Sequence, residues 1–263
     1  MSARNASAAK PNLLLALTEG PRTLLDVSVL CSWRWLPQQF LRGDGHGVLV
    51  IPGFLGGDGY NRMLTNFLCG LGYQAVGWGQ GRNLGPRAEL LDGMAQQVER
   101  LVEKTQGKIS IVGHSLGGVY AREIARERPE FVRQVISLGS PINDDGRATT
   151  PSARLFRLLN GEPDTESSLR STAPPVPITS VYTKADGVVA WQQALQYAGH
   201  EHCENIEVPG SHCGLTWNLS VNHLLADRLS QNDGEWRPFV RPEKFRFLFP
   251  DNRRDLQMLG LGG

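Results

Sequence analysis

One stretch of the chain decides the fold, and it runs ISIVGHSLGGVYAREIARERP over residues 109–129. Its apolar opening, Ile109–Val112, predicts a strand, and Leu116–Arg128 predicts a helix that Pro129 ends. Between the two lies a Gly-x-Ser-x-Gly pattern centred on Ser115. A serine on a sharp turn projects its oxygen clear of the sheet, and the flanking glycines leave room where strand and helix approach closely. The pattern predicts a nucleophilic serine beside a helix N-terminus, whose free N–H groups would stabilise an oxyanion.

The same alternation of strand and helix extends on both sides of this stretch. Apolar runs predict strands at 48–51, 74–78, 109–112, 135–138, 178–182 and 204–208, and helical periodicity predicts helices at 60–71, 90–102, 116–128, 191–198 and 221–229. Regular alternation of this kind predicts an α/β fold with a mostly parallel central sheet and helices on both faces. Residues 141–177 interrupt the rhythm, and we interpret them as a short lid insertion over the sheet edge.

The two ends of the chain differ from this middle part. Residues 1–44 predict an N-terminal arm and helix, with a loose arm over 1–22 and a helix packed on the domain within 23–41. The α/β domain is expected over 45–233. Residues 234–263 form an aromatic and basic tail, which we interpret as a strap packed back onto the domain, with contact to a partner or a membrane as the alternative.

Composition excludes several classes of protein. The chain has 263 residues, and Lys plus Arg number 27 against 26 Asp plus Glu, so no overall basic field exists to hold nucleic acid. Four cysteines are too few for a disulfide-rich scaffold. No apolar run approaches the roughly 20 residues of a membrane span or the roughly 7–15 of a signal peptide. We therefore expect a soluble protein of the cytoplasm.

The residues quoted above resemble the α/β-hydrolase superfamily, and its lipase and esterase branch in particular, over about residues 45–230. The resemblance implies an α/β-hydrolase fold in which the nucleophile, the acid and the histidine follow one another along the chain. Ser115 is followed by Asp186, after the strand at 178–182, and by His212, after the strand at 204–208. The carboxyl ends of parallel strands share one sheet edge, so the three side chains are expected to meet there.

This triad implies a serine hydrolase that cleaves carboxylic esters, as a carboxylesterase or lipase of lipid metabolism, through an acyl-enzyme. The same triad would also serve a thioesterase, an amidase, a polyester hydrolase or an acyltransferase, and a non-catalytic binding protein on this scaffold is the remaining alternative. Family likeness assigns the oxyanion hole to the backbone N–H groups of Leu116 and Phe54, with Leu55 as the second choice for the latter. Residues expected at the substrate cleft are Leu55, Arg82, Asn83 and His114, although a structural turn is an equal interpretation of Arg82 and Asn83.

Several rival signals carry less weight. Asp144 and Asp145 follow the strand predicted at 135–138 and are alternatives to Asp186 as the acid. The remaining histidines, at positions 46, 200, 202 and 223, are poorly placed to act as the base. No second ligand group accompanies the stretch from His200 to Cys203 at zinc-site spacing, so no metal is expected. Leu84 replaces the last glycine that a dinucleotide loop at 77–85 requires, so no cofactor is expected. A strand separates Cys203 from Cys213 by about 16 Å, which predicts free thiols.

Overall fold

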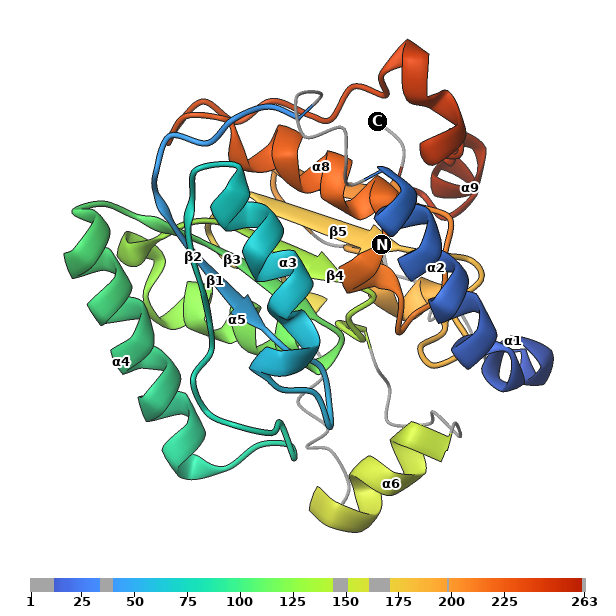
Figure 1. Cartoon of the computed structure of the whole chain (residues 1–263), viewed down its shortest axis with the longest axis horizontal. Helices are drawn as coiled ribbons and strands as arrows, with labels where there is room; N and C mark the ends of the chain where they lie inside the picture. Colours follow the sequence, from blue (N-terminus) through green and yellow to red (C-terminus); the bar gives the residue numbers. More distant parts are fainter. Residues whose placement is uncertain (1–11, 34–39, 144–150, 161–170, 198, 262–263) are drawn as a thin grey trace.

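A six-stranded parallel sheet forms the centre of the molecule in the computed structural model, which describes residues 12–33, 40–143, 151–160, 171–197 and 199–261 (Figure 1). The strands are β1 (Gly47–Ile51), β2 (Gln74–Gly77), β3 (Ile109–His114), β4 (Val132–Leu138), β5 (Ile178–Tyr182) and β6 (Cys203–Glu207). All six were predicted from the apolar runs. They lie in the order β2-β1-β3-β4-β5-β6. β2 is added on one side of β1 and β3 on the other, so the order of the strands changes direction between β1 and β3. Open α/β sheets bind ligands beside such a reversal, outside the carboxyl ends of the strands.

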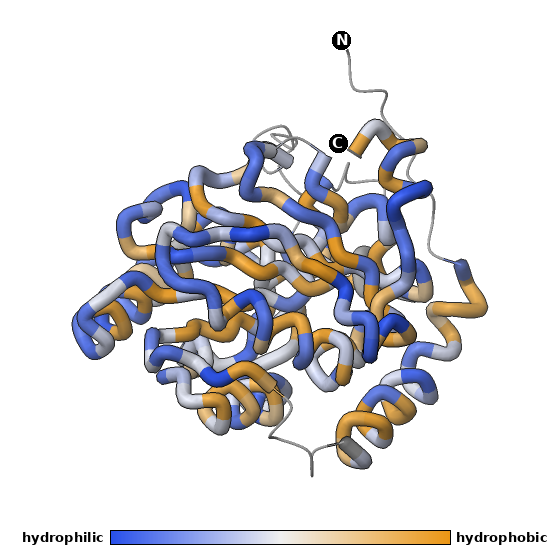
Figure 2. The backbone as a smooth tube through the Cα atoms, turned by 90° about the horizontal axis from the view of Figure 1, so that it is seen from above, coloured by the Kyte–Doolittle hydropathy of each residue, from blue (hydrophilic) through white to orange (hydrophobic). Residues whose placement is uncertain are grey.

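Helices cover both faces of the sheet, as the alternation predicts. Residues of α3 (Asp58–Gly70) and α8 (Leu219–Leu229) share a core with Val48 and Val50 on one face. On the other face, α4 (Ala88–Thr105) and α5 (Leu116–Glu127) share a core with the intervening strand residues Leu49 and Ile51. Because both faces are covered, β1 is apolar throughout, whereas the surface helices alternate in hydropathy along the tube of Figure 2.

The N-terminal segment departs from the sequence prediction. A loose arm was expected over residues 1–22, but residues 13–17 form α1 (Leu13–Leu17) and Glu19 begins α2 (Glu19–Trp33). α2 packs against α8 and the short 3-10 helix η4 (Leu215–Trp217). The apolar pattern concealed this contact, because Glu19 is buried while Leu13 and Leu17 are exposed.

Two further segments can be compared with the sequence prediction. The helix expected at 191–198 is wrong in extent: a single 3-10 turn, η3 (Trp191–Ala194), is followed by extended backbone at Leu195, and the next backbone N–H, of Gln196, is bound by the Asn205 side chain. Of the expected insertion at 141–177, the structure describes α6 (Pro151–Asn160) together with 141–143 and 171–177. The Phe156 ring of α6 contacts the Phe54 ring, with 5.3 Å between centroids.

The C-terminal tail packs back onto the domain, in agreement with its interpretation as a strap. It contains the 3-10 helix η5 (Glu243–Leu248) and α9 (Arg253–Met258). Phe249 is buried in the same core as α8. Just before α9, the Asn252 amide donates to the Tyr182 hydroxyl on β5, at 3.1 Å. The division of the chain into three parts stays a prediction.

Candidate active site

Ser115 occupies a strained turn between β3 and α5. Its backbone has φ 51° and ψ −121°, a conformation that residues with a side chain rarely adopt. A Cβ on Gly113 would lie 2.4 Å from the Gly117 carbonyl oxygen, and one on Gly117 would lie 2.4 Å from that of Ile51. Glycine is thus required at both positions, and the close packing holds Ser115 half-exposed at the carboxyl end of the sheet.

Asp186 and His212 form a buried pair at the same edge. His212 Nδ1 lies 2.6 Å from Asp186 Oδ2, and both side chains are almost inaccessible to solvent. The other oxygen of Asp186 accepts hydrogen bonds from the backbone N–H groups of Val188 and Val189, at 2.8 and 2.7 Å. Burial disfavours a charged imidazole, but the charge and hydrogen bond of Asp186 outweigh it and raise the pKa of His212.

The serine turn and this pair are joined through the backbone. The Ser115 N–H donates to the carbonyl of Leu138 at 2.8 Å, and the next residue, Gly139, lies against the pair. A Cβ on Gly139 would be 3.1 Å from His212 Nδ1 and 3.4 Å from Asp186 Oδ2. The structure therefore brings the three predicted triad residues to one edge of the sheet.

Two backbone N–H groups flank the serine without an acceptor in the described part of the chain, those of Phe54 and Leu116. A Cβ on Gly53 would lie 3.0 Å from Ser115 Cβ, so the loop after β1 passes directly over the serine. The second choice, Leu55, is wrong, because its N–H already donates to the Asn83 carbonyl at 2.6 Å. The N–H groups of Phe54 and Leu116 are thus available beside the serine as two hydrogen-bond donors, the number that an oxyanion hole requires.

Asn83 holds this loop in place. Its side chain is fully buried and donates to the Pro52 carbonyl at 2.8 Å, and its backbone N–H donates to Gly56 at 2.8 Å. These contacts favour the structural-turn interpretation of Asn83. Arg82, its neighbour, is exposed, and Leu55 is 43% exposed with φ 65°.

His114 lies beneath the histidine loop. Its Nε2 is 3.0 Å from the His212 carbonyl oxygen, which only accepts, so Nε2 carries the proton. The ring stacks on Tyr60 with 5.7 Å between centroids. Burial, followed by the nearby charge of His212, lowers the pKa of His114 to about 3, so the ring is neutral. This placement gives His114 a supporting contact with His212 in addition to its predicted place at the cleft.

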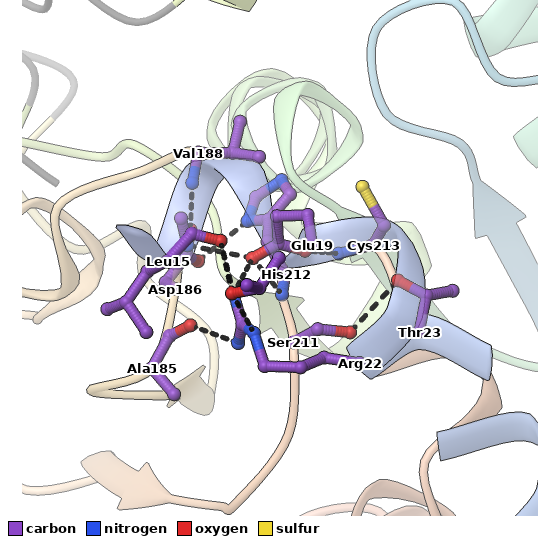
Figure 3. Close-up of polar contacts among 12 residues, drawn as sticks. Leu15, Glu19, Arg22, Thr23, Ala185, Asp186, Val188, Ser211, His212 and Cys213 are labelled. Atoms are coloured by element: carbon purple, nitrogen blue, oxygen red, sulfur yellow. Dashed lines mark hydrogen bonds and ion pairs between the residues drawn. The ribbon is translucent and has the colours of Figure 1, made fainter. Parts of the chain in front are cut away.

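α2 makes polar contacts with the loops that carry Asp186 and His212, and these contacts were missed from the sequence (Figure 3). Glu19 binds the backbone on both loops, and Asp26 accepts from the N–H and hydroxyl of Ser211 at 3.0 and 2.7 Å. Arg22 donates to the Ala185 carbonyl at 2.5 Å. These residues are spaced i, i+3 and i+7, one face of a helix, and that polar spacing was the available signal.

The rival residues lie elsewhere. Asp144 and Asp145 fall outside the described residues. His46 is at the opposite end of β3, where it contacts Ser110; His200 contacts Pro174, His202 lies over Trp236, and His223 lies among phenylalanines. Among the residues that the structure describes, no group of three or more His, Cys, Asp or Glu has a metal-binding arrangement. Cys203 and Cys213 are free thiols, as predicted.

Comparisons with known proteins agree with this architecture. The family model of the PGAP1-like alpha/beta domain matches residues 73–203. A metagenome-derived lipolytic enzyme of the LipS and LipT pair is 15% identical, with a TM-score of 0.53 over 72% of this chain and 93% of that one. Lipase B of Aspergillus fumigatus is 17% identical, with a TM-score of 0.55 over 76% of this chain, which spans only 56% of that lipase.

A thioesterase domain from the curacin biosynthetic pathway is 16% identical, with a TM-score of 0.51 over 73% of this chain and 93% of that domain. No curated protein sequence matches the chain. The chain has the α/β-hydrolase fold, and the matched family model is likewise that of an alpha/beta domain. Within the described ranges, no helix is both long and apolar enough to cross a membrane.

Proposed function

We propose that this protein is a serine hydrolase that cleaves carboxylic esters through an acyl-enzyme. The observation that carries the proposal is the strained, half-exposed Ser115 at the sheet edge that also holds the buried Asp186–His212 pair. A strained serine conformation costs free energy on the order of 1–3 kcal/mol and persists where function requires it. The two N–H groups without acceptors, of Phe54 and Leu116, support the same chemistry.

Each residue has a defined role in the proposed reaction. His212 takes the proton of the Ser115 hydroxyl as its oxygen attacks the ester carbonyl, and returns that proton to the leaving alcohol. Asp186 fixes the tautomer of His212 and stabilises the imidazolium. The N–H groups of Phe54 and Leu116 stabilise the oxyanion, each worth about 2.7–4 kcal/mol. Water activated by His212 then hydrolyses the acyl-enzyme and frees Ser115.

The surroundings of the serine favour a substrate with an apolar acyl group. The ring of Phe54, on the loop that passes over Ser115, packs against the Phe156 ring, and the next residue of this loop, Leu55, exposes apolar surface. Two structurally similar proteins are lipolytic, which agrees with this class of substrate. A thioesterase domain shares the fold as well, so a thioester is the alternative that the experiment must test. A cytoplasmic location, a lid function for α6 and peripheral membrane contact stay predictions.

Labelling with a fluorophosphonate probe tests the proposal without a known substrate. We expect modification of Ser115, located by peptide mass mapping, in the wild-type protein and none in S115A. A series of p-nitrophenyl esters and acyl thioesters, each with short and long acyl chains, then separates esterase from thioesterase. Folded wild-type protein that stays unlabelled with and without detergent would refute the proposal and favour the binding-protein alternative.

A further inference from the structure

The carboxylate of Glu19 joins the loop of the acid to the loop of the histidine. Its Oε1 accepts from the N–H of Gly187 at 2.8 Å and from that of His212 at 3.3 Å, and its Oε2 accepts from Cys213 at 3.2 Å. Gly187 directly follows Asp186, so a single buried side chain fixes the backbone beside both partners of the 2.6 Å hydrogen bond. Arg22, one turn later in α2, completes the site with an ion pair at 2.9 Å.

The catalytic loops carry glycine where the N-terminal segment comes closest. A Cβ on Gly187 would lie 2.5 Å from the backbone carbon of Leu15, and one on Gly214 would lie 2.0 Å from Asp26 Oδ2. These close approaches are independent of the Glu19 hydrogen bonds. They show that α1 and α2 pack directly against both loops, so the two helices can fix the conformation of the loops.

We infer that Glu19 is a positioning residue that holds the Asp186–His212 pair in its reactive geometry. The inference rests on the proposed function, since it names a determinant of the same site. A carboxylate that accepts three backbone N–H groups resists displacement, because each hydrogen bond to a charged acceptor is stronger than a neutral one. Displacement of a catalytic group by 1 Å costs up to about 10²-fold in rate, so fixing both loops affects turnover directly.

Glu19 also adds negative charge beside His212. The groups that face His212 are Asp186 on the acid loop, Glu19 on α2, His114 below the ring and Cys213 next in the chain, with Arg22 and Tyr60 in contact with them. Burial lowers the pKa of His212, and Asp186 followed by Glu19 raises it. Loss of the Glu19 charge must therefore shift the pKa of His212 downward.

Three variants separate the reach of Glu19 from its charge. E19Q removes the charge, E19D keeps the charge but withdraws it by one methylene, and E123Q is the matched control. Glu123 makes the same i, i+3 ion pair with an arginine, at 2.8 Å, on α5. We expect kcat to fall about 10- to 100-fold in E19Q and E19D, with KM within about twofold, because only the positioning of the pair is altered. E123Q should retain wild-type kcat.

NMR of the imidazoles gives a readout that does not depend on substrate. The titration of His212, assigned by its loss in H212N, should occur at lower pH in E19Q than in wild type. E19D, which keeps the charge at a greater distance, should show a smaller shift, and E123Q should titrate as wild type. An unchanged titration in E19Q together with unchanged kcat would overturn the inference. Should the wild-type protein fail to react with esters and the probe, the proposed function fails, while the titration still decides whether Glu19 acts on His212. E19D covers the case in which E19Q does not fold.

Discussion

A serine, a histidine and an aspartate lie at each end of β3, and each set of three is called a series below. The two series differ in solvent access, in backbone strain and in the pKa of the histidine. At the amino end, His46 Nε2 lies 2.8 Å from Ser110 Oγ, and His46 Nδ1 lies 2.5 Å from Asp44 Oδ1. At the carboxyl end stand Ser115, His212 and Asp186. Ser110 is fully buried within the sheet, whereas Ser115 is half-exposed on a strained turn.

The electrostatics of the two histidines also differ. Burial lowers the pKa of His46, and the charge of Arg133 adds to this effect, although Asp44 opposes it. Arg133 donates to Asp44 at 2.7 Å, so the aspartate is shared between a histidine and an arginine. The pKa of His212 is raised instead, because the charge and hydrogen bond of Asp186, with the charge of Glu19, outweigh the effect of burial. The proposed active site is thus distinguished from the amino-end series by solvent access, a strained serine and N–H groups without acceptors in the described residues.

Replacement of the two serines should give the largest contrast. S115A is expected to lower kcat about 10⁴- to 10⁶-fold, because the nucleophile is lost. S110A should keep wild-type kcat but lose about 1–3 kcal/mol of unfolding free energy, since His46 Nε2 is left buried without its partner. Ester kinetics and urea unfolding measure the two effects. Activity that fell in S110A while its fold persisted would contradict the distinction.

Replacement of Asp186 and Asp44 should likewise affect activity at one end of β3 and stability at the other. D186N is expected to lower kcat about 10⁴-fold by allowing the wrong tautomer of His212. D44N should leave kcat unchanged and cost about 1–2 kcal/mol of stability, a value reduced for the partial exposure of Asp44. Kinetics at saturating substrate and thermal unfolding of both variants check this expectation. Equal loss of activity in both would show that the amino-end series acts on the reaction.

The free N–H donors can be tested through the residue that holds their loop. N83A leaves the Pro52 carbonyl without its donor, and we expect kcat to fall about 10-fold, less than the 10²–10³-fold of losing a donor outright. R82A, at the exposed neighbour, should stay within about twofold in kcat and KM. A larger loss in R82A than in N83A would restore Arg82 as a substrate contact and weaken the assignment of the loop.

The smallest effect concerns pH. His212 must be neutral to accept the serine proton, so its raised pKa places the acid limb of kcat/KM above the ordinary imidazole value of about 6.5. D186N should move this limb to lower pH, because the raising charge is lost. D44N should leave it in place, since Asp44 acts on His46. Rate profiles for the three proteins over pH 5–9, roughly two units either side of neutrality, measure the shift.

Sequence patterns predicted the sheet, and also the sheet edge at which Ser115, Asp186 and His212 lie, for a physical reason. A strand covered on both faces is mostly apolar, and a strand-to-helix turn as tight as that at Ser115 admits only glycine at 113 and 117. Both constraints act on neighbouring residues and are therefore visible in a short stretch.

The contribution of α2 could not be predicted in the same way. Its contact with the catalytic loops is polar, so a search for apolar periodicity finds the exposed leucines and passes over Glu19 and Asp26. The engaged backbone N–H of Leu55 was equally invisible, because backbone hydrogen bonds leave no trace in residue type. These features depend on which distant segments meet, and a single sequence does not state that.

The hydrogen bond between Glu19 and the His212 amide spans 193 residues of chain. During synthesis α2 leaves the ribosome long before the loop that it must meet, and contacts between such distant segments form late in folding. A nascent or truncated chain that ends before His212 would therefore carry the serine turn without a working pair. We expect recovery of esterase activity on refolding to lag behind recovery of helical signal, so that turnover reports completion of the native topology.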